Sequence, residues 1–342
     1  MATLRVDPVD PDAEVIARAA ELLRRGELVA FPTETVYGLG AHALDERAVH
    51  RIFEAKGRPS YNPLIVHVSG VEEARRVAAD WPRPAHKLAE RYWPGPLTLV
   101  LPKRPEVPDV VTAGLASVAI RVPAHAVARS LLRAAGVPVA APSANRSTEL
   151  SPTTARHVEK SLGDRVALIL DGGPTDVGIE STVLDLSGSA PVLLRPGRIS
   201  AEDLEPFVGP IARLTAAPRG EGPRPAPGML ERHYAPRATL LLVDPSDATD
   251  AERTRLRVRQ EAQRGGRVGA LVRGGAAMPD AHRVIAMPHT ADEYARRLYA
   301  ALHELDDAGC TLIVVDRVPA DGAWAAVADR LERAAHRPRP EV

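Results

Sequence analysis

The stretch "DAEVIARAAELLRRGELVAFP", residues 12–32, combines two hydrophobic periodicities. Its first part places a set of apolar side chains on one face at helical spacing: Val15, Ile16, Ala19, Leu22 and Leu23. Gly26 is typical of a helix end, and the run "ELVAFP" that follows indicates a short strand ending at a proline. The stretch therefore predicts a helix followed by a strand, which is the repeating unit of an α/β fold.

The same alternation continues to about residue 207 and predicts one α/β domain over residues 1–207. Residues 208–237 are rich in Pro, Gly and Arg and have no period, which is typical of a linker. A second alternation begins at "ATLLLV" and predicts a small Rossmann-like α/β domain over residues 238–342. The single cysteine, Cys310, excludes a disulfide framework and a Cys-rich metal site, and we expect it to be a small buried hydrophobe.

The charge balance restricts the possible partners of the 342-residue chain. Lys+Arg and Asp+Glu both number 44, so no overall basic field would hold nucleic acid, and we expect no strong intrinsic nucleic-acid binding. No signal-peptide pattern and no run of roughly 18 apolar residues is present, so we expect a cytoplasmic protein without membrane association.

Generic nucleotide and metal motifs are weak in this sequence. There is no P-loop pattern, and the loose G-x-G-x-x-A match at residues 38–43 lies too far beyond the predicted strand for a dinucleotide site. His303 lies in "HELDD", which lacks the spacing of a zinc-binding helix and indicates a solvated helix face.

Four loops at predicted strand ends carry most of the polar side chains that could bind a ligand. They are "FPTETVYGLG" (31–40), "KGRPSYNPL" (56–64), "APSANRSTELSPT" (141–153) and "DGGPTDVGIEST" (171–182). Gly, Pro, Ser and Asn are also the ordinary residues of turns, so each loop alone is ambiguous. In the first loop we expect Gly38 and Gly40 to let the backbone approach a ligand.

The second loop holds two cations, Lys56 and Arg58, on a segment stiffened by Pro59 and Pro63. Fixing two like charges near one another is costly, and a polyphosphate anion offsets that cost. The loop therefore favours a phosphate-binding site.

Eight blocks in order resemble the YrdC-like threonylcarbamoyl-adenylate synthases in their long two-domain form. They are "FPTETVYGLG", "KGRPSYNPLIVH", "YWPGPLTLVL", "SVAIRVPAH", "APSANRS", "DGGPTDVGIESTVLD", "RPGRI" and "PGMLERHYAP". The likeness is dense over residues 12–236 and rests on position and pattern beyond them. It implies a twisted α/β catalytic domain that makes threonylcarbamoyl-AMP and pyrophosphate from L-threonine, bicarbonate and ATP, followed by the Rossmann-like domain.

The resemblance also implies roles for individual residues. L-Threonine would be held by Thr35, His67, Arg121, the backbone at Ala141, and Ser181. ATP would be held by Lys56, Arg58, Asn62, Ser117, Ser143, Asn145, Ser151, Arg195 and Tyr234. Lys56 and Arg58 are the expected catalytic residues, with Lys56 on the phosphates, and the segment containing Tyr234 would close over the nucleotide.

The implied chemistry is the attack of a carbamate on the α-phosphate, so charge neutralisation and positioning matter more than a general base. Mg²⁺ is expected with ATP, held by phosphate and water, without a dedicated protein site. The expected partner is the machinery that transfers the threonylcarbamoyl group to tRNA.

The sequence departs from the pattern of this family in two places. Thr148 stands where the family commonly has Gly, and Leu230 and Glu231 stand where a basic and aromatic pair is usual. An RNA-binding or regulatory module is a second reading, because a basic cavity also suits a phosphate backbone. A carbamoyl-transfer maturation factor is a third, but such chains are rich in cysteine.

Overall fold

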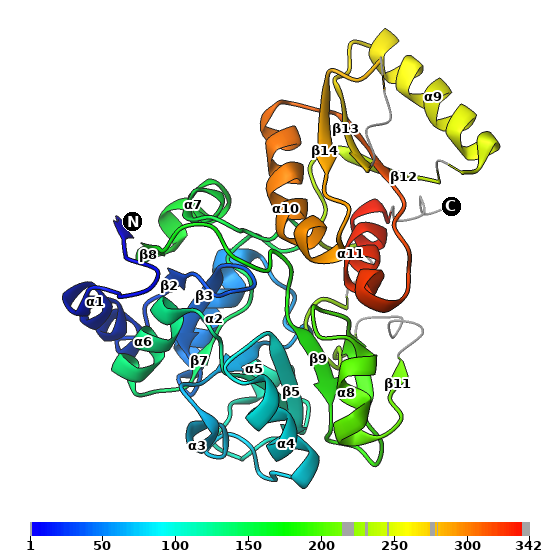
Figure 1. The fold of residues 1–342 in the computed structure, drawn as a ribbon. Coiled ribbons are helices and arrows are strands. Elements are labelled where there is room, and N and C mark those ends of the chain that lie inside the picture. Colours follow the sequence, from blue (N-terminus) through cyan, green and yellow to red (C-terminus); the bar gives the residue numbers. More distant parts are fainter. Residues whose placement is uncertain are drawn as a thin grey trace. The chain divides into compact units, whose positions relative to one another are not determined.

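A computed structural model describes residues 2–213, 222–229, 232–244, 246–273, 278 and 280–336. The chain divides into two compact units, which are considered one at a time. The first comprises Met1–Ser147 and Ser151–Met229, and the second comprises Thr148–Leu150 and Leu230–Val342. Both units are α/β, as the alternation of helical and strand patterns predicted (Figure 1).

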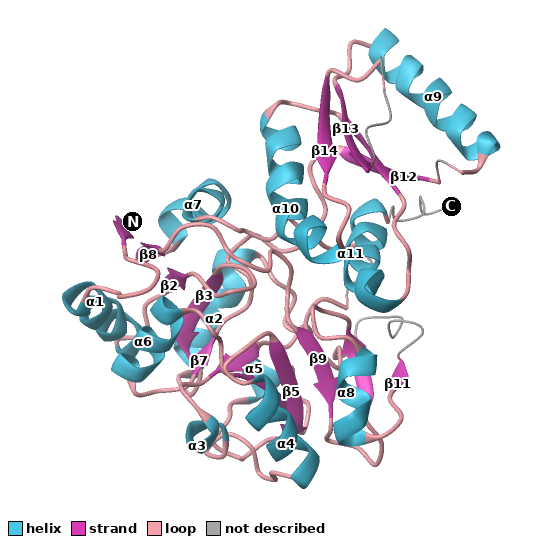
Figure 2. Ribbon diagram, in the orientation of Figure 1, coloured by secondary structure: helices cyan, strands magenta, loops and turns pink. Residues whose placement is uncertain are grey.

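The first unit is built on a mixed sheet in the order β1-β8-β2-β3-β7-β4-β6-β5-β9-β10-β11. The strands are β1 (Ala2–Arg5), β2 (Val29–Phe31), β3 (Gly38–His42), β4 (Ile65–His67), β5 (Leu97–Pro102), β6 (Ser117–Arg121), β7 (Val139–Ala140), β8 (Leu168–Asp171), β9 (Thr182–Asp185), β10 (Val192–Arg195) and β11 (Ala212–Arg213). Most are short, so loops follow one another closely along the sheet (Figure 2).

The helices of this unit are mostly short and capped by side chains. They are α1 (Ala13–Arg24), α2 (Glu46–Lys56), α3 (Val71–Ala74), α4 (Arg83–Tyr92), α5 (Asp109–Thr112), α6 (Ala126–Ala135), α7 (Ala155–Leu162) and α8 (Ala201–Val208), with a 3₁₀ turn, η1, at Gly163–Arg165. Asp12 and Asp45 accept backbone N–H groups at the starts of α1 and α2. Gly57 ends α2 with φ 58°, which directs the chain after Lys56 away from the helix axis.

Side chains alternate between the two faces of the central strands. Val66, Ile120 and Leu184 belong to a large apolar core on one face. Ile65, Ala119 and Val183 belong to a smaller cluster on the other face. We call the second one the site face, because Ser117, His67 and Arg121 stand at even spacing from Ala119 and Ile65 and share it.

Part of the predicted linker packs on the site face. Ala226 and Met229 join its apolar cluster, and both are almost fully buried. The backbone N–H of Arg224 donates to the Tyr61 carbonyl at 3.0 Å, and its guanidinium lies 5.7 Å from the Tyr61 ring centroid. Residues 222–229 are therefore part of the first unit, whereas residues 214–221, 230 and 231, including the departures Leu230 and Glu231, lie outside the described residues.

The loop with two glycines differs from its predicted role. Gly38 and Gly40 lie within β3, and a Cβ at Gly40 would stand 2.8 Å from Phe31 Cε1 and 3.0 Å from Val139 Cγ1. The expectation that these glycines admit a ligand is therefore wrong for Gly40. It is small because neighbouring side chains fill the space above the strand.

The second unit contains a parallel sheet in the order β12-β15-β13-β14. Its elements are β12 (Thr239–Val243), α9 (Ala248–Gln263), β13 (Val268–Arg273), β14 (Arg283–Met287), α10 (Ala291–Asp307), β15 (Leu312–Asp316), η2 (Gly322–Trp324) and α11 (Ala325–Ala335). Cys310 is buried, as predicted. The expectation that His303 lies on a solvated helix face is wrong, because His303 is buried on α10 at 8% exposure. Within the described ranges of the chain, no helix is long and apolar enough to cross a membrane.

Candidate active site

The site face is organised along two parallel strands, β4 and β6. Their register pairs Ile65 with Ala119 and His67 with Arg121, so the last two side chains are neighbours at the carboxyl ends. Ser117 begins β6, about 13 Å from Arg121 at the usual rise of a strand. His67 and Arg121, both predicted for L-threonine, therefore lie at the carboxyl ends of these strands, and Ser117, predicted for ATP, lies at the other end of β6.

Arg121 is buried at 3% exposure, and its guanidinium has a partner on each nitrogen. Nε donates to the Gly95 carbonyl at 3.2 Å, and Nη1 donates to Thr35 Oγ1 at 2.9 Å. Nη2 forms an ion pair with Glu34 Oε1 at 2.7 Å but donates no hydrogen bond within the described residues. Buried polar atoms normally have hydrogen-bond partners, so this edge of the guanidinium is suited to a ligand.

His67 is held as a neutral ring. Burial, followed by the charge of Arg121, lowers its pKa to about 3. Its Nδ1 lies 3.3 Å from the Ile65 carbonyl, and its ring meets Phe31 edge-on at 6.4 Å. The imidazole can therefore contribute shape and a hydrogen bond but no positive charge at neutral pH.

Ser181 and Arg195 connect the two predicted substrate groups. Arg195 lies at the end of β10 and donates from Nε to the Ser181 carbonyl at 3.0 Å and from Nη2 to Ser181 Oγ at 3.1 Å. Its Nη1 donates to the Pro227 carbonyl at 3.2 Å. A residue predicted for ATP thus contacts one predicted for L-threonine.

On the other side of β4, next to β7, the Ala141 N–H donates to the Ile65 carbonyl at 2.9 Å.

Lys56 joins two of the four loops. Its Nζ donates to the Ser143 carbonyl at 2.6 Å and to the Asn145 carbonyl, and the side chain is 2% exposed. In return, the Ser147 N–H donates to the Lys56 carbonyl at 2.8 Å. The ammonium is therefore placed by backbone dipoles of the loop that carries Ser143 and Asn145.

Arg58 and Asn62 face one another across the turn that follows α2. Arg58 Nε donates to the Asn62 carbonyl at 3.0 Å and Nη2 donates to the Pro63 carbonyl at 2.7 Å. The Asn62 side chain is fully buried, and its Oδ1 and Nδ2 have no hydrogen-bond partner in the described part of the chain. An amide with both functions unused is a group suited to a ligand that both donates and accepts.

Ser151 lies beside a carboxylate that the sequence did not single out. Ser151 Oγ donates to Glu180 Oε1, and both residues are buried. Nearby in sequence, Thr148 adopts φ 69°, in the left-handed region where the family commonly has Gly. Thr148 therefore occupies a backbone conformation that glycine adopts without strain.

Tyr234 belongs to the second unit. It is 1% exposed, its backbone has φ 59°, and its ring lies 6.0 Å from that of Tyr299, with the Arg330 guanidinium 5.0 Å from its centroid. Both of these neighbours, Tyr299 and Arg330, belong to the same unit as Tyr234. Its predicted contact with a nucleotide remains a prediction.

The sequence assigned no role to two buried acids, Glu34 and Glu180, which are 7% and 6% exposed. Both stand in the quoted loops beside predicted residues, Thr35 and Ser181. In both loops a carboxylate lies next to hydroxyl residues near a strand end, and this pattern could have indicated that the acids belong to the site.

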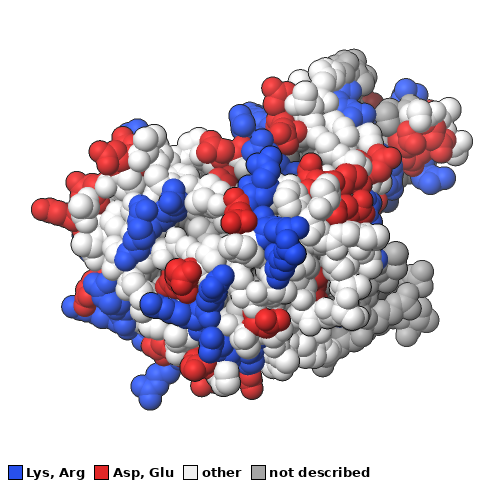
Figure 3. Space-filling model, turned by 60° about the horizontal axis from the view of Figure 1, so that its bottom comes forward, with Lys and Arg blue, Asp and Glu red and all other residues white. Residues whose placement is uncertain are grey.

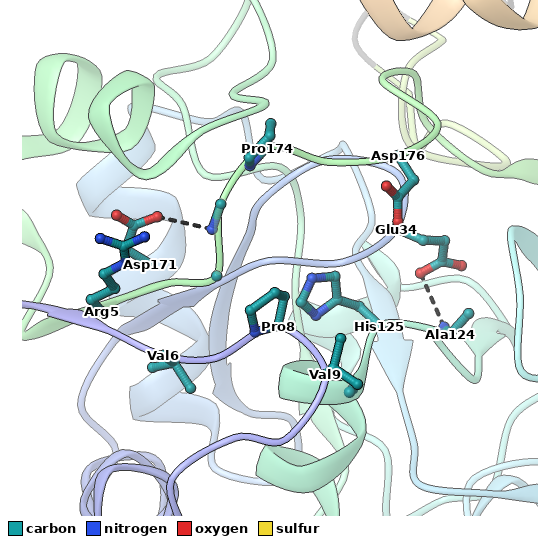
Figure 4. A pocket seen from close by; sticks show the side chains of 13 residues that line it. Arg5, Val6, Pro8, Val9, Glu34, Ala124, His125, Asp171, Pro174 and Asp176 are labelled. Carbon is teal, nitrogen blue, oxygen red and sulfur yellow. Dashed lines mark hydrogen bonds between the residues drawn. The ribbon is translucent and has the colours of Figure 1, made fainter.

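A cavity of about 600 Å³ adjoins Glu34 in the first unit (Figure 4). Its wall consists of Arg5, Val6, Pro8, Val9, Glu34, Ala124, His125, Ala126, Asp171, Gly172, Gly173, Pro174 and Asp176. Carboxylates outnumber cations there. Among the residues that the structure describes, no group of three or more His, Cys, Asp or Glu could hold a metal ion.

Figure 3 presents Lys and Arg interspersed with Asp and Glu on the visible face. This pattern agrees with the neutral charge balance and argues against the RNA-binding reading.

Comparison with known proteins covers nearly the whole chain. The family Sua5–YciO–YrdC, described as "Telomere recombination", matches residues 21–197, and "Threonylcarbamoyl-AMP synthase, C-terminal domain" matches residues 199–336. The threonylcarbamoyl-AMP synthase of Pyrococcus abyssi is 46% identical over 319 residues, 92% of each chain. That of Bacillus subtilis is 43% identical over 334 residues, 96% of this chain and 95% of the relative. The crystal structure of P. abyssi Sua5 complexed with L-threonine has a TM-score of 0.89 at 42% identity and covers 98% of each chain.

Proposed function

Because the chain belongs to the two-domain Sua5/YrdC family of threonylcarbamoyl-AMP synthases, we propose that it makes threonylcarbamoyl-AMP and pyrophosphate from L-threonine, bicarbonate and ATP. This makes it a nucleotidyltransferase. The observation that carries the proposal is the row of buried polar groups along β4 and β6, with Arg121 and Asn62 each keeping hydrogen-bonding atoms unused by the described residues.

The reaction joins two anions. The threonine amine and bicarbonate give a carbamate with loss of water, and a carbamate oxygen then attacks the α-phosphorus of ATP. The bond from that phosphorus to the bridging oxygen of the β-phosphate breaks, and pyrophosphate leaves with the electron pair. The protein's task is to hold both anions and neutralise their charge, for which fixed cations are suited.

The carboxyl ends of β4 and β6 are the proposed L-threonine site. Arg121 would bind the substrate carboxylate with the unused edge of its guanidinium, since an arginine fork matches a carboxylate. Thr35, His67, Ser181 and the backbone at Ala141 would surround the amino acid. The neutral His67 favours a hydrogen bond to the threonine hydroxyl, because a charged ring is unavailable at neutral pH.

The turn after α2 and the loop after β7 are the proposed ATP site. Arg58 and Lys56 would face the phosphates, and the orphaned amide of Asn62 suits a group with a donor and an acceptor, such as adenine. Ser117, Ser143, Asn145, Ser151, Arg195 and Tyr234 complete the proposed set. Mg²⁺ would enter with ATP as part of the substrate, and the product would pass to the machinery that modifies tRNA adenosine.

The direct test is mass spectrometry of the product formed from ATP, L-threonine and bicarbonate, with L-serine as competitor. We expect threonylcarbamoyl-AMP, with pyrophosphate release that depends on both threonine and bicarbonate. Arg58→Ala should abolish this release. Pyrophosphate release without bicarbonate, or an amino-acid adenylate as product, would show that the carbamate step is wrong.

A further inference from the structure

Glu34 is a buried carboxylate to which the proposed assignments give no role. It lies between β2 and β3 and is 7% exposed. One oxygen, Oε1, lies 2.7 Å from Arg121 Nη2. The other, Oε2, accepts a hydrogen bond from the Ala124 N–H at 3.0 Å (Figure 4). Its own carbonyl accepts the Val177 N–H at 2.7 Å. The carboxylate is thus held in one place by its neighbours.

A carboxylate beside Arg121 has a cost for substrate binding. It neutralises part of the positive charge that would attract the carboxylate of L-threonine. A buried pair is also weak evidence for stability, because both charges lose their hydration. A carboxylate at this position is therefore explained only if it contributes something to the site that outweighs the weaker attraction for the substrate.

The benefit lies in the geometry of the guanidinium. Arg121 has an anchor on each of its nitrogens: the Gly95 carbonyl at Nε, Thr35 Oγ1 at Nη1 and Glu34 Oε1 at Nη2. Nη1 carries two hydrogens and donates one to Thr35 Oγ1, and Nη2 donates no hydrogen bond within the described residues, so both nitrogens keep an N–H direction for a bidentate ligand. Among the residues that the structure describes, Glu34 is the one group paired with Nη2.

We infer that Glu34 is a positioning residue: it orients the Arg121 guanidinium so that a substrate carboxylate meets both free N–H directions at once. The inference rests on the proposed assignment of Arg121 to L-threonine. The adjoining cavity is useful for testing it, because open space next to Glu34 means that a side chain of similar size creates no packing clash.

The experiment compares full-length Glu34→Gln with wild type in steady-state kinetics of pyrophosphate release. Gln can accept from Ala124 or face Arg121 with its oxygen, but it cannot satisfy both and carries no charge. We expect the KM for L-threonine to rise about 10- to 100-fold, as for a misplaced binding group. The kcat at saturating threonine and the KM for ATP should stay within about twofold of wild type.

Two comparisons separate positioning from a general structural effect. L-Threoninol lacks the carboxylate, so its inhibition constant should be the same in wild type and Glu34→Gln. Glu73→Gln is the matched control, because Glu73 also accepts a backbone N–H, from Ser69 at 2.6 Å, and has no arginine partner in the described contacts. It should leave all constants unchanged.

Several outcomes overturn the inference. An unchanged KM for L-threonine removes Glu34 from the mechanism, and a lower KM shows that it acts only as a competing charge. Parallel losses for ATP and L-threoninol show a structural role. If Glu34→Gln does not fold, Glu34→Asp keeps the charge but shortens its reach, and an unchanged threonine KM there is equally decisive. Arg121→Lys with an unchanged threonine KM would instead show that the Arg121 assignment is wrong.

Discussion

Replacing Lys56 with Met tests whether this cation is part of the scaffold as well as of the chemistry. Met keeps the length of the side chain and removes the ammonium, leaving the carbonyls of Ser143 and Asn145 without their donor. An unsatisfied buried acceptor costs about 1–3 kcal/mol, so two cost about 2–6 kcal/mol. Met does not require a charge to be desolvated, which offsets part of this cost. We therefore expect a loss of about 2 kcal/mol or more in the free energy of unfolding.

The measurement is urea unfolding followed by tryptophan fluorescence, because Trp81 and Trp93 belong to the same unit as Lys56. A loss of about 2 kcal/mol corresponds to a fall in Tm of about 4–8 °C for a unit of this size. The matched control is Lys103→Met. Lys103 also donates to a backbone carbonyl, that of Val107 at 3.1 Å, but its ion-pair partner Asp109 is 82% exposed, so its loss should cost less than about 1 kcal/mol. A Lys56→Met variant no less stable than Lys103→Met would refute the view that Lys56 holds the loop.

Three further changes follow from the local geometry. His67 has a pKa of about 3 in the folded protein and 6.5 when unfolded, so its contribution to stability is complete above pH 6.5. Below pH 6.5 the free energy of unfolding falls by about 1.4 kcal/mol per pH unit, and the loss is about 2 kcal/mol at pH 5. His67→Gln should flatten the measured acid dependence, and an unchanged slope contradicts a buried neutral ring. Thr148→Gly should raise the Tm. Removing a β-branched side chain at φ 69° relieves about 1–2 kcal/mol of strain, whereas the greater entropy that glycine loses on folding costs only about 0.5–1 kcal/mol. A lower Tm would show that Thr148 is not strained. Gly40→Ala should destabilise by about 1–3 kcal/mol through contact with Phe31 and Val139, whereas Gly188→Ala, with no atom within 4 Å of its new Cβ, should be neutral, and equal effects would refute the packing argument.

The sequence predicted where the loops lie better than what each side chain does in them. Hydrophobic runs that stop at Pro, Gly or Ser correctly indicate strand ends, because buried strands and polar turns obey local rules. The acceptors of Lys56 Nζ are 87 and 89 residues away in the chain, and no local pattern reveals them. The pairing of Glu34 with Arg121 is hidden for the same reason.

The glycines illustrate the opposite error. "YGLG" resembles a ligand-binding turn because glycine permits close approach, but close approach to a side chain leaves the same signature. Gly40 is set by Phe31, nine positions earlier on the paired strand β2. Whether a ligand or a neighbouring side chain approaches a glycine depends on which strands pair, and a single sequence does not show the pairing.

The way the cations are held bears on the proposed binding of two anions. Lys56, Arg58, Arg121 and Arg195 each donate to backbone carbonyls. These dipoles compensate part of the repulsion among the positive charges, so the folded chain places the cations before substrate binds. In the proposed reaction, little reorganisation would then be needed as charge moves from carbamate to pyrophosphate, which is the condition under which fixed groups lower a barrier most. If the cations act as proposed, substitutions of these residues should lower Tm and turnover together.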